Sequence, residues 1–266
     1  MPEPLLQVRD LTIQFHLCLD AAVKNVSFDL FAAETVGLVG ESGCGKTTLA
    51  RALLGLLSNC CCCQTGSVRF LGKDLAKANS SQLQHIRGNR LSLIAQEPEL
   101  ALNPVISIGK QIEEVLLAHR RCDRQTRTRE VESILHSVGL SEPGFYSAFP
   151  HQLSGGQRQR VVIAQALICK PGLLIADEPT SSIDTITQSA ILNLLRTLQQ
   201  RLGLSVLYIT HDPDLLRGFA TRLLVMRAGE IVEQGSFAEV YRSPHHSYTK
   251  ELLTSIPPWP VCSDAG

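Results

Sequence analysis

The sequence carries no surplus of charge of either sign. Its 25 lysine and arginine residues are matched by 25 aspartate and glutamate residues, which leaves a formal net charge of zero. Domains that bind nucleic acid generally present a strongly basic face, because they must neutralise phosphate charge. The balanced composition gives no indication of such a face, so we predict no nucleic-acid partner.

Long apolar runs are also missing. No uncharged stretch approaches the roughly 20 residues that an α-helix needs to cross a bilayer. The first four residues have neither a basic region nor an apolar run behind them, so we do not expect a signal peptide. If the protein works at a membrane, another chain must span it.

The nine cysteines offer little for a metal site. Their number is odd, four of them are consecutive at positions 60–63, and the others are scattered. Adjacent cysteines make poor tetrahedral metal sites, and no separate C-x-x-C pair completes one. We therefore predict that the cysteines at 60–63 form a loop after the first helix of a protein in a reducing cytosol. A redox or soft-metal role for this run is the alternative.

The overall composition is that of an ordinary globular protein with an ample core, at 44% hydrophobic and 19% charged residues. The 266 residues suffice for one large domain or two small ones. No internal repeat and no low-complexity linker divides the chain. We therefore expect a single folded domain.

Residues 40–48 organise the sequence. They read GESGCGKTT and fit G-x-x-x-x-G-K-[ST], the phosphate-binding loop. The apolar run 35–39 precedes them and is typical of a buried parallel strand, whereas apolar residues over 49–57 recur at helical spacing. Strand, glycine loop and helix in this order are the context that the motif requires.

The chemistry of a nucleoside triphosphate explains the residue types of this loop. The first turn of a helix offers unpaired N–H groups to an anion, and glycines let the backbone wrap the phosphates. We expect Lys46 to reach the β- and γ-phosphate oxygens and the Thr47 hydroxyl to bind Mg²⁺, whereas Cys44 fills a variable position. The predicted ATP-binding residues of the loop are Gly40, Glu41, Ser42, Gly43, Cys44, Gly45, Lys46, Thr47 and Thr48.

Periodicity predicts strands and helices in alternation. The expected strands cover residues 5–15 (as two short strands), 26–30, 35–39, 67–71, 90–95, 173–178, 205–210, 222–227 and 230–234. The expected helices cover 49–57, 107–119, 126–138, 158–169 and 187–202, with one short helix after 236. Strand signals are missing between 97 and 170, which indicates a helical insertion in an α/β core.

Four polar residues each stand at the carboxyl end of an apolar strand: Gln96, Asp177, Glu178 and His211. Ligands bind at this edge in open α/β sheets. We expect Asp177 to hold Mg²⁺ and Glu178 to orient or deprotonate the attacking water. Gln96 is placed to touch the metal or the water, and His211 to contact the γ-phosphate.

Residues 153–157 form a second candidate anion site, this time without a lysine. Ser154 can cap a helix N-terminus, and Gly155 and Gly156 leave its N–H groups open. Gln157 completes the motif.

In this order the motifs resemble the ATP-binding subunit of ABC transporters, over residues 5–256. The resemblance implies an α/β fold, with a phosphate-loop (RecA-like) ATPase core, an N-terminal antiparallel β subdomain and a helical insertion subdomain. It divides a single domain into a core at 1–96 and 171–235, a helical subdomain at 97–170 and a tail at 236–266. It identifies the Walker A motif at 40–48, the Q-loop at Gln96, the signature at 153–157, the Walker B motif at 173–177, the catalytic base Glu178, the D-loop at 181–184, the switch histidine His211 and the adenine-stacking aromatic Phe15.

Finer similarity indicates the importers of peptides and nickel. Residues 83–104, 174–180 and the tail motif 243–249 carry it. The sequence departs from that family at Ser182 and Ile183 of the D-loop and at Phe15, where tyrosine is commoner. Because the tail holds only Cys262, we expect no iron–sulfur cluster there.

The resemblance also implies a mechanism and partners. Two such subunits, identical or paralogous, would pair head to tail, so that the signature of one covers the ATP of the other. Two membrane permease subunits would receive the helical part, with an extracytoplasmic solute-binding protein acting indirectly. The protein would then lie peripherally on the cytoplasmic face of the inner (plasma) membrane.

Two alternatives stay open at this point. One is an ATPase subunit of another ABC system, such as a metallophore transporter or an exporter. The other is a non-transport ABC ATPase of DNA repair or translation. That class generally carries coiled-coil inserts or two cassettes in one chain, whereas this sequence has one cassette and no heptad run.

Overall fold

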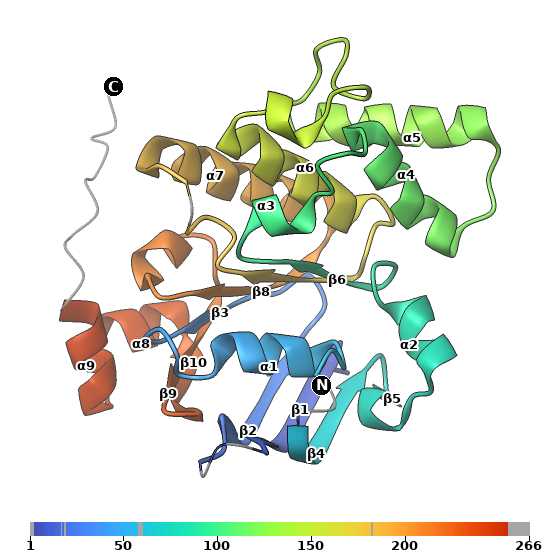
Figure 1. Cartoon of the computed structure of the whole chain (residues 1–266). Helices are drawn as coiled ribbons and strands as arrows, with labels where there is room; N and C mark the ends of the chain where they lie inside the picture. Colours follow the sequence, from blue (N-terminus) through green and yellow to red (C-terminus); the bar gives the residue numbers. More distant parts are fainter. Residues whose placement is uncertain (1–2, 17, 19, 58–60, 182, 255–266) are drawn as a thin grey trace.

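The computed structural model describes residues 3–16, 18, 20–57, 61–181 and 183–254 (Figure 1). Two β-sheets stack with a helix between them. The helices within residues 98–167, called the helical region below, cover the outer face of the larger sheet. Ser182 of the predicted D-loop and Cys262 of the tail lie outside the described residues.

The larger sheet has six strands in the order β10-β9-β3-β8-β7-β6. Strands β3, β7 and β8 are buried at every position, which explains why their sequences read as continuous apolar runs. Neighbouring strands from β9 to β6 run parallel, and β10 closes one edge in the antiparallel direction. The bounds are β3 Thr35–Val39, β6 Leu91–Ile94, β7 Leu173–Asp177, β8 Ser205–Thr210, β9 Arg222–Arg227 and β10 Glu230–Ser236.

The smaller sheet is antiparallel, in the order β2-β1-β4-β5. Its bounds are β1 Leu6–Phe15, β2 Val23–Leu30, β4 Cys61–Phe70 and β5 Lys73–Asp74. The two short strands expected over 5–15 are one strand. Its pairing shifts register between Arg9 and Thr12, and Asp10 has a positive φ of 50° there. This irregularity breaks the alternation of apolar residues without ending the strand.

The predicted cysteine loop is wrong for Cys61–Cys63, because strand β4 begins at Cys61. The backbone of this segment pairs with the end of β1, where Phe15 faces Cys61 and Gln14 faces Cys63. Pairing with a partner strand decides its conformation, and local sequence does not report that partner. Cys60 lies outside the described residues.

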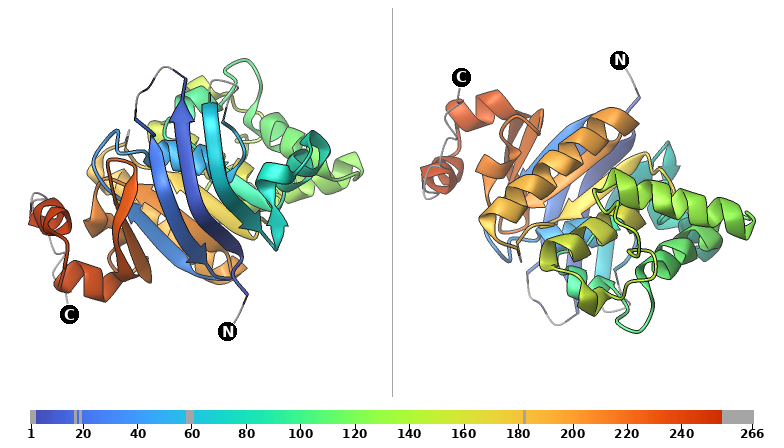
Figure 2. Two further views of the ribbon diagram at one scale, coloured as in Figure 1. Left: turned by 90° about the horizontal axis from the view of Figure 1, so that it is seen from below. Right: turned by 90° about the horizontal axis from the view of Figure 1, so that it is seen from above.

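The helices fall into three groups. Helix α1 lies between the two sheets, the helical region covers the far face of the larger sheet together with α7, and α2, α8 and α9 lie at the sides (Figures 1 and 2). The bounds are α1 Lys46–Leu53, α2 Ser80–Ile86, α3 Pro98–Ala101, α4 Ile108–His119, α5 Arg124–Ser137, α6 Gly155–Leu167, α7 Thr185–Leu202, α8 Phe237–Arg242 and α9 Ser247–Thr254, with 3-10 turns at Leu75–Lys77 (η1), Pro150–Gln152 (η2) and Pro213–Leu216 (η3).

The tail contains two short helices, α8 and α9, where the sequence predicted one. Helix α8 begins at a capping box in which Ser236 and Glu239 bond each other's backbone N–H groups. Helix α9 is apolar on one face only, with Tyr248 and Leu252 buried. Eight residues are too few for a clear period, so the burial of Tyr248 and Leu252 in the apolar core stabilises this helix.

Two apolar cores lie on opposite faces of the six-stranded sheet. One joins the sheet to the helical region and α7, with Leu174, Val206 and Ile163 among its members. The other joins the sheet to α1 and the antiparallel strands, with Leu38, Leu49 and others. The larger sheet therefore contributes side chains to both cores. The predicted fold class, an α/β core with an antiparallel sheet and a helical insertion, is confirmed.

Candidate nucleotide site

The loop between β3 and α1 has a shape that only glycine allows. Gly45 is the N-cap of α1, with a φ of 110°, and a Cβ there would lie 2.3 Å from the carbonyl oxygen of Ala22. A Cβ on Gly40 would lie 2.2 Å from the carbonyl oxygen of Met226. Both distances are far below van der Waals contact, so side chains are excluded at both ends of the loop. Residues 41–43 are exposed, which leaves this part of the loop open to a ligand.

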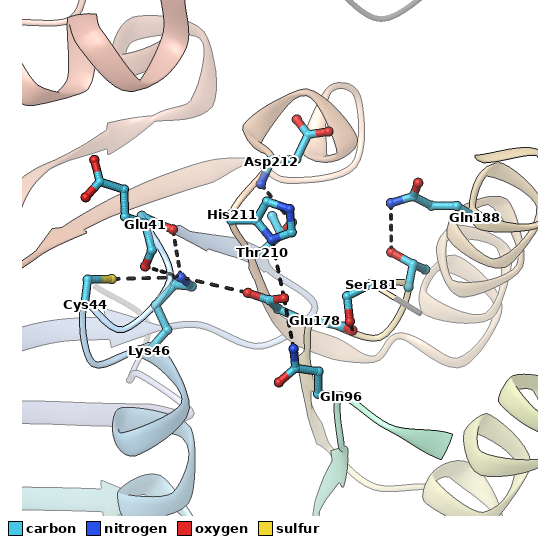
Figure 3. A network of polar contacts seen from close by, with 12 residues as sticks. Glu41, Cys44, Lys46, Gln96, Glu178, Ser181, Gln188, Thr210, His211 and Asp212 are labelled. Atoms are coloured by element: carbon cyan, nitrogen blue, oxygen red, sulfur yellow. Dashed lines mark hydrogen bonds and ion pairs between the residues drawn. The ribbon is translucent and has the colours of Figure 1, made fainter. Parts of the chain in front are cut away.

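Lys46, the first residue of α1, is buried with its ammonium group inside the loop. The Nζ atom donates hydrogen bonds to the carbonyl oxygens of Gly40, at 2.7 Å, and Glu41, at 2.8 Å (Figure 3). It also lies 3.9 Å from Oε1 of Glu178. The loop therefore holds a cation in place before any phosphate arrives.

The Glu178 carboxylate stands at the centre of the polar cluster. Its Oε1 faces Lys46, and its Oε2 accepts a hydrogen bond from Nε2 of Gln96 at 3.4 Å. The same Oε2 lies 3.4 Å from Nδ1 of His211 (Figure 3). Because β6, β7 and β8 are adjacent parallel strands, the residues that follow them meet at one edge. The structure thus brings Lys46, Gln96, Glu178 and His211 together.

The backbone of Glu178 is unusual for a residue with a side chain. Its φ is +44°, in the left-handed region that glycine favours. Its N–H donates to the carbonyl oxygen of Ile209, and its own carbonyl oxygen accepts from the Ser181 hydroxyl. Such strain costs about 1–3 kcal/mol and is concentrated at functional sites. Here it turns the carboxylate towards Lys46.

Asp177 ends strand β7 beside Thr47. Its side chain is buried, and no hydrogen-bond partner for its Oδ1 exists among the described residues. Burial raises the pKa of Asp177, and a hydrogen bond with the Thr47 side chain opposes that rise. An unpartnered buried carboxylate oxygen beside a hydroxyl is a donor set that suits a hard cation such as Mg²⁺. The residues present therefore fit the metal that the sequence predicted.

The predicted signature lies at the start of α6. The Ser154 hydroxyl accepts from the Gln157 N–H at 3.3 Å, and Gln157 Oε1 accepts from the Ser154 N–H at 2.9 Å. Ser154 and Gly155 are exposed. Among the described residues, no hydrogen bond or ion pair joins this cap to the phosphate loop. One chain alone therefore does not unite the two predicted anion sites.

The two remaining observations concern side chains near the loop. Phe15, at the end of β1, is partly buried and packs against the core around α1, which leaves part of its ring free.

Tyr248 of α9 was missed as a site residue. Its hydroxyl accepts a hydrogen bond from the Glu41 N–H at 3.0 Å. The only signal in the sequence was a tail motif that we interpreted as a mark of the subgroup.

A glycine loop at a helix N-terminus, with a buried lysine facing strand-end carboxylates, defines a phosphate-loop ATPase. The family described as "ABC transporter" matches residues 23–181, which is more than half of the chain. The chain belongs to the ABC transporter family and is its ATP-binding subunit, an ATPase.

Individual relatives agree with this assignment. The dipeptide transport ATP-binding protein DppD of Bacillus subtilis is 42% identical over 96% of this chain and 77% of its own length. The peptidoglycan transport ATP-binding protein YejF of Agrobacterium fabrum is 45% identical over 96% of this chain, which spans about half (47%) of that relative.

A solved structure has the same fold. The ATP-binding cassette MJ0796, in a dimeric post-hydrolysis state bound to ADP and Pi, aligns with a TM-score of 0.77 at 28% identity. The alignment covers 87% of this chain and 98% of that one. In the described part of the present chain, every helix is too short or too polar to cross a membrane.

Proposed function

We propose that this chain hydrolyses ATP to energise the import of dipeptides or oligopeptides, or of nickel-type solutes, through a separate membrane permease. The observation that carries the proposal is the Glu178 carboxylate. One of its oxygens faces the Lys46 ammonium, and the other faces the side chains of Gln96 and His211. The transport names of the relatives support the peptide class.

Each residue of the cluster has a role that its position permits. Lys46, which the two loop carbonyls hold in place, directs its remaining N–H donor at the phosphate oxygens when ATP binds. Glu178 then accepts a hydrogen bond from the attacking water and orients it towards the γ-phosphate. His211, at the end of β8, stabilises the charge that develops on the γ-phosphate oxygens.

The metal completes this chemistry. When bound, Mg²⁺ neutralises phosphate charge, and Thr47, Asp177 and Gln96 would hold it. The buried, unpartnered Oδ1 of Asp177 supports this role, because a cation would supply the partner that it lacks.

A second ABC ATPase subunit, identical or paralogous, completes the nucleotide site. Residues 154–157 form a capped helix N-terminus in which Ser154 and Gly155 are exposed, and among the described residues no bond joins them to the phosphate loop of their own chain. We propose that they cover the γ-phosphate of ATP bound to the partner. The partner's own residues 154–157 would cover the ATP of this chain, with Phe15 stacking on the adenine.

Two permease subunits would dock on the helical region, at the cytoplasmic face of the membrane. Two large apolar side chains are exposed just after Gln96: Leu100 at 82% and Val105 at 79%. Exposed apolar groups of this size beside a site residue are suited to a protein contact. The extracytoplasmic solute-binding protein would act through the permease.

Co-purification with the permease and reconstitution in vesicles test this function. We expect the assembled complex to hydrolyse ATP faster when a peptide and the solute-binding protein are present. Peptide uptake should be lost when the gene for this chain is deleted. A complex stimulated only by a metallophore, or one that exports, would support another ABC system. A chain that copurifies with no permease would support the non-transport alternative.

A further inference from the structure

The peptide group between Gly40 and Glu41 is held at both of its polar ends. Its carbonyl oxygen, on Gly40, accepts a hydrogen bond from Lys46 Nζ at 2.7 Å. Its N–H, on Glu41, donates to the hydroxyl of Tyr248 at 3.0 Å. A peptide group is planar, so the tyrosine that fixes the N–H also fixes the direction of the carbonyl oxygen. Tyr248 therefore determines where an acceptor for the Lys46 ammonium points.

Tyr248 is itself held firmly. Its side chain is 1% exposed, and the guanidinium of Arg227 lies 4.8 Å from the centre of its ring. Its N–H donates to Nδ1 of His246 at 3.1 Å. The N–H groups of His245 and His246 donate in turn to the two carboxylate oxygens of Glu233, at 2.8 and 3.1 Å. Strands β9 and β10 thus anchor the segment that presents the hydroxyl to the loop.

We propose that Tyr248 is a positioning residue of the nucleotide site, which acts on ATP through the Gly40–Glu41 peptide and Lys46. The proposal rests on the proposed function only in taking ATP as the ligand. The hydroxyl acts through the backbone, by accepting the hydrogen bond of the Glu41 N–H. It restricts the rotation of a peptide that glycine would otherwise leave free, and so keeps the ammonium ready for phosphate.

Tyr248→Phe isolates the hydroxyl, because it keeps the ring and its contact with Arg227. We expect the dissociation constant of ATP to rise about threefold to tenfold, which corresponds to the loss of one neutral hydrogen bond. In the nucleotide-free protein, hydrogen exchange should become faster in the peptide that contains Glu41. Both measurements use the purified full chain, with a fluorescent ATP analogue for the first.

Tyr241→Phe is the matched control, because it removes a hydroxyl from the same tail. That hydroxyl bonds Asp214 and Arg217, outside the phosphate loop. It should leave the ATP dissociation constant and the exchange at Glu41 unchanged. A tyrosine with only a structural role would lower the melting temperature in Tyr248→Phe without changing either quantity, and that result would overturn the proposal.

The two proposals fail in different ways. If the wild-type chain binds ATP and Tyr248→Phe binds it equally well, the positioning role alone is wrong. If the wild-type chain binds ATP and the tyrosine behaves as expected, but no peptide stimulates the assembled complex, the positioning role stands. The import function is then the part that fails.

Discussion

The Glu178 carboxylate lies 3.4 Å from Nδ1 of the His211 imidazole, at the carboxyl ends of two adjacent strands. The strained backbone of Glu178 directs the side chain there, with a φ of +44°. Glycine would adopt this φ without strain. A strained glutamate in its place indicates that the side chain has a function. The two side chains therefore define the point at which the attacking water is expected.

Glu178→Gln should separate ATP binding from turnover. The amide keeps the size of the side chain and loses its basicity, so we expect the turnover number to fall about 100-fold to 10,000-fold. ATP affinity should stay within about threefold of the wild-type value. Steady-state phosphate release and equilibrium nucleotide binding measure the two. Glu230→Gln, on an exposed position of β10, should change neither. Normal turnover in Glu178→Gln would exclude the carboxylate as the base.

Asp177→Asn should stabilise the nucleotide-free protein while it impairs hydrolysis. Burial raises the pKa of Asp177 in the folded state above the ordinary value of 3.8. The folded protein therefore binds this proton more tightly than the unfolded chain does. Ionised Asp177 consequently costs stability, and the cost is absent below pH 3.8 and grows as the pH rises through the folded pKa.

The difference in free energy of unfolding between Asp177→Asn and wild type should be positive at pH 7 and should shrink as the pH falls. Urea titrations at several pH values measure it. Mg²⁺-dependent turnover should fall about 100-fold or more, because the metal loses a charged ligand. A variant that is less stable than wild type at pH 7 would contradict the assignment of the raised pKa.

Gly45→Ala should close the phosphate loop to its ligand. The new Cβ would lie 2.3 Å from the Ala22 carbonyl oxygen, at a φ of 110°. We expect a loss of about 2–5 kcal/mol in the free energy of unfolding, from the conformational cost and the clash together, and no measurable ATP binding.

Gly43→Ala provides the comparison for that variant. Gly43 has a φ of 80°, and a Cβ there meets nothing within 4 Å. Only the conformational cost of about 1–2 kcal/mol should apply, without a steric clash. Equal losses in the two variants, by urea denaturation, would show that the contact with Ala22 is irrelevant.

Ser154→Ala should weaken the ATP-dependent dimer more than the fold. Loss of the N-cap of α6 costs about 1 kcal/mol of stability. Because the hydroxyl is also expected to face the partner's ATP, a Glu178→Gln background that dimerises with ATP should stay monomeric when Ser154→Ala is added. Size-exclusion chromatography with ATP measures this.

Ser236→Ala removes an equivalent cap, at the start of α8. It should cost similar stability and leave the ATP-dependent dimer intact. A loss of dimer in both variants would mean that stability, and not the signature, controls the pairing.

The sequence predicted the central features of the site because simple rules apply there. A buried parallel strand reads as an apolar run, and the polar residue that ends the run must lie at the carboxyl edge of the sheet. Gln96, Glu178 and His211 were therefore predicted to be neighbours, although 82 residues separate the first two. The glycine loop was recognised from its spacing and its flanks.

Features that depend on distant pairing were not predicted. Cys61–Cys63 join a sheet because the end of β1 is their partner, and nothing within the cysteine run reports it. The second tail helix and the bond between Tyr248 and Glu41 depend on the packing of α9 against β9 and β10. No local pattern of residues encodes such a contact.

The hydrogen bond between Glu41 and Tyr248 joins residues 207 positions apart. During synthesis the glycine loop leaves the ribosome long before helix α9, which carries Tyr248. Strand β3 must also wait for its neighbours, because it pairs with β8 and β9, which end at Thr210 and Arg227. The last gain in affinity would then come only when α9 has been translated and has docked, so the nucleotide site is completed by one of the last described elements of the chain.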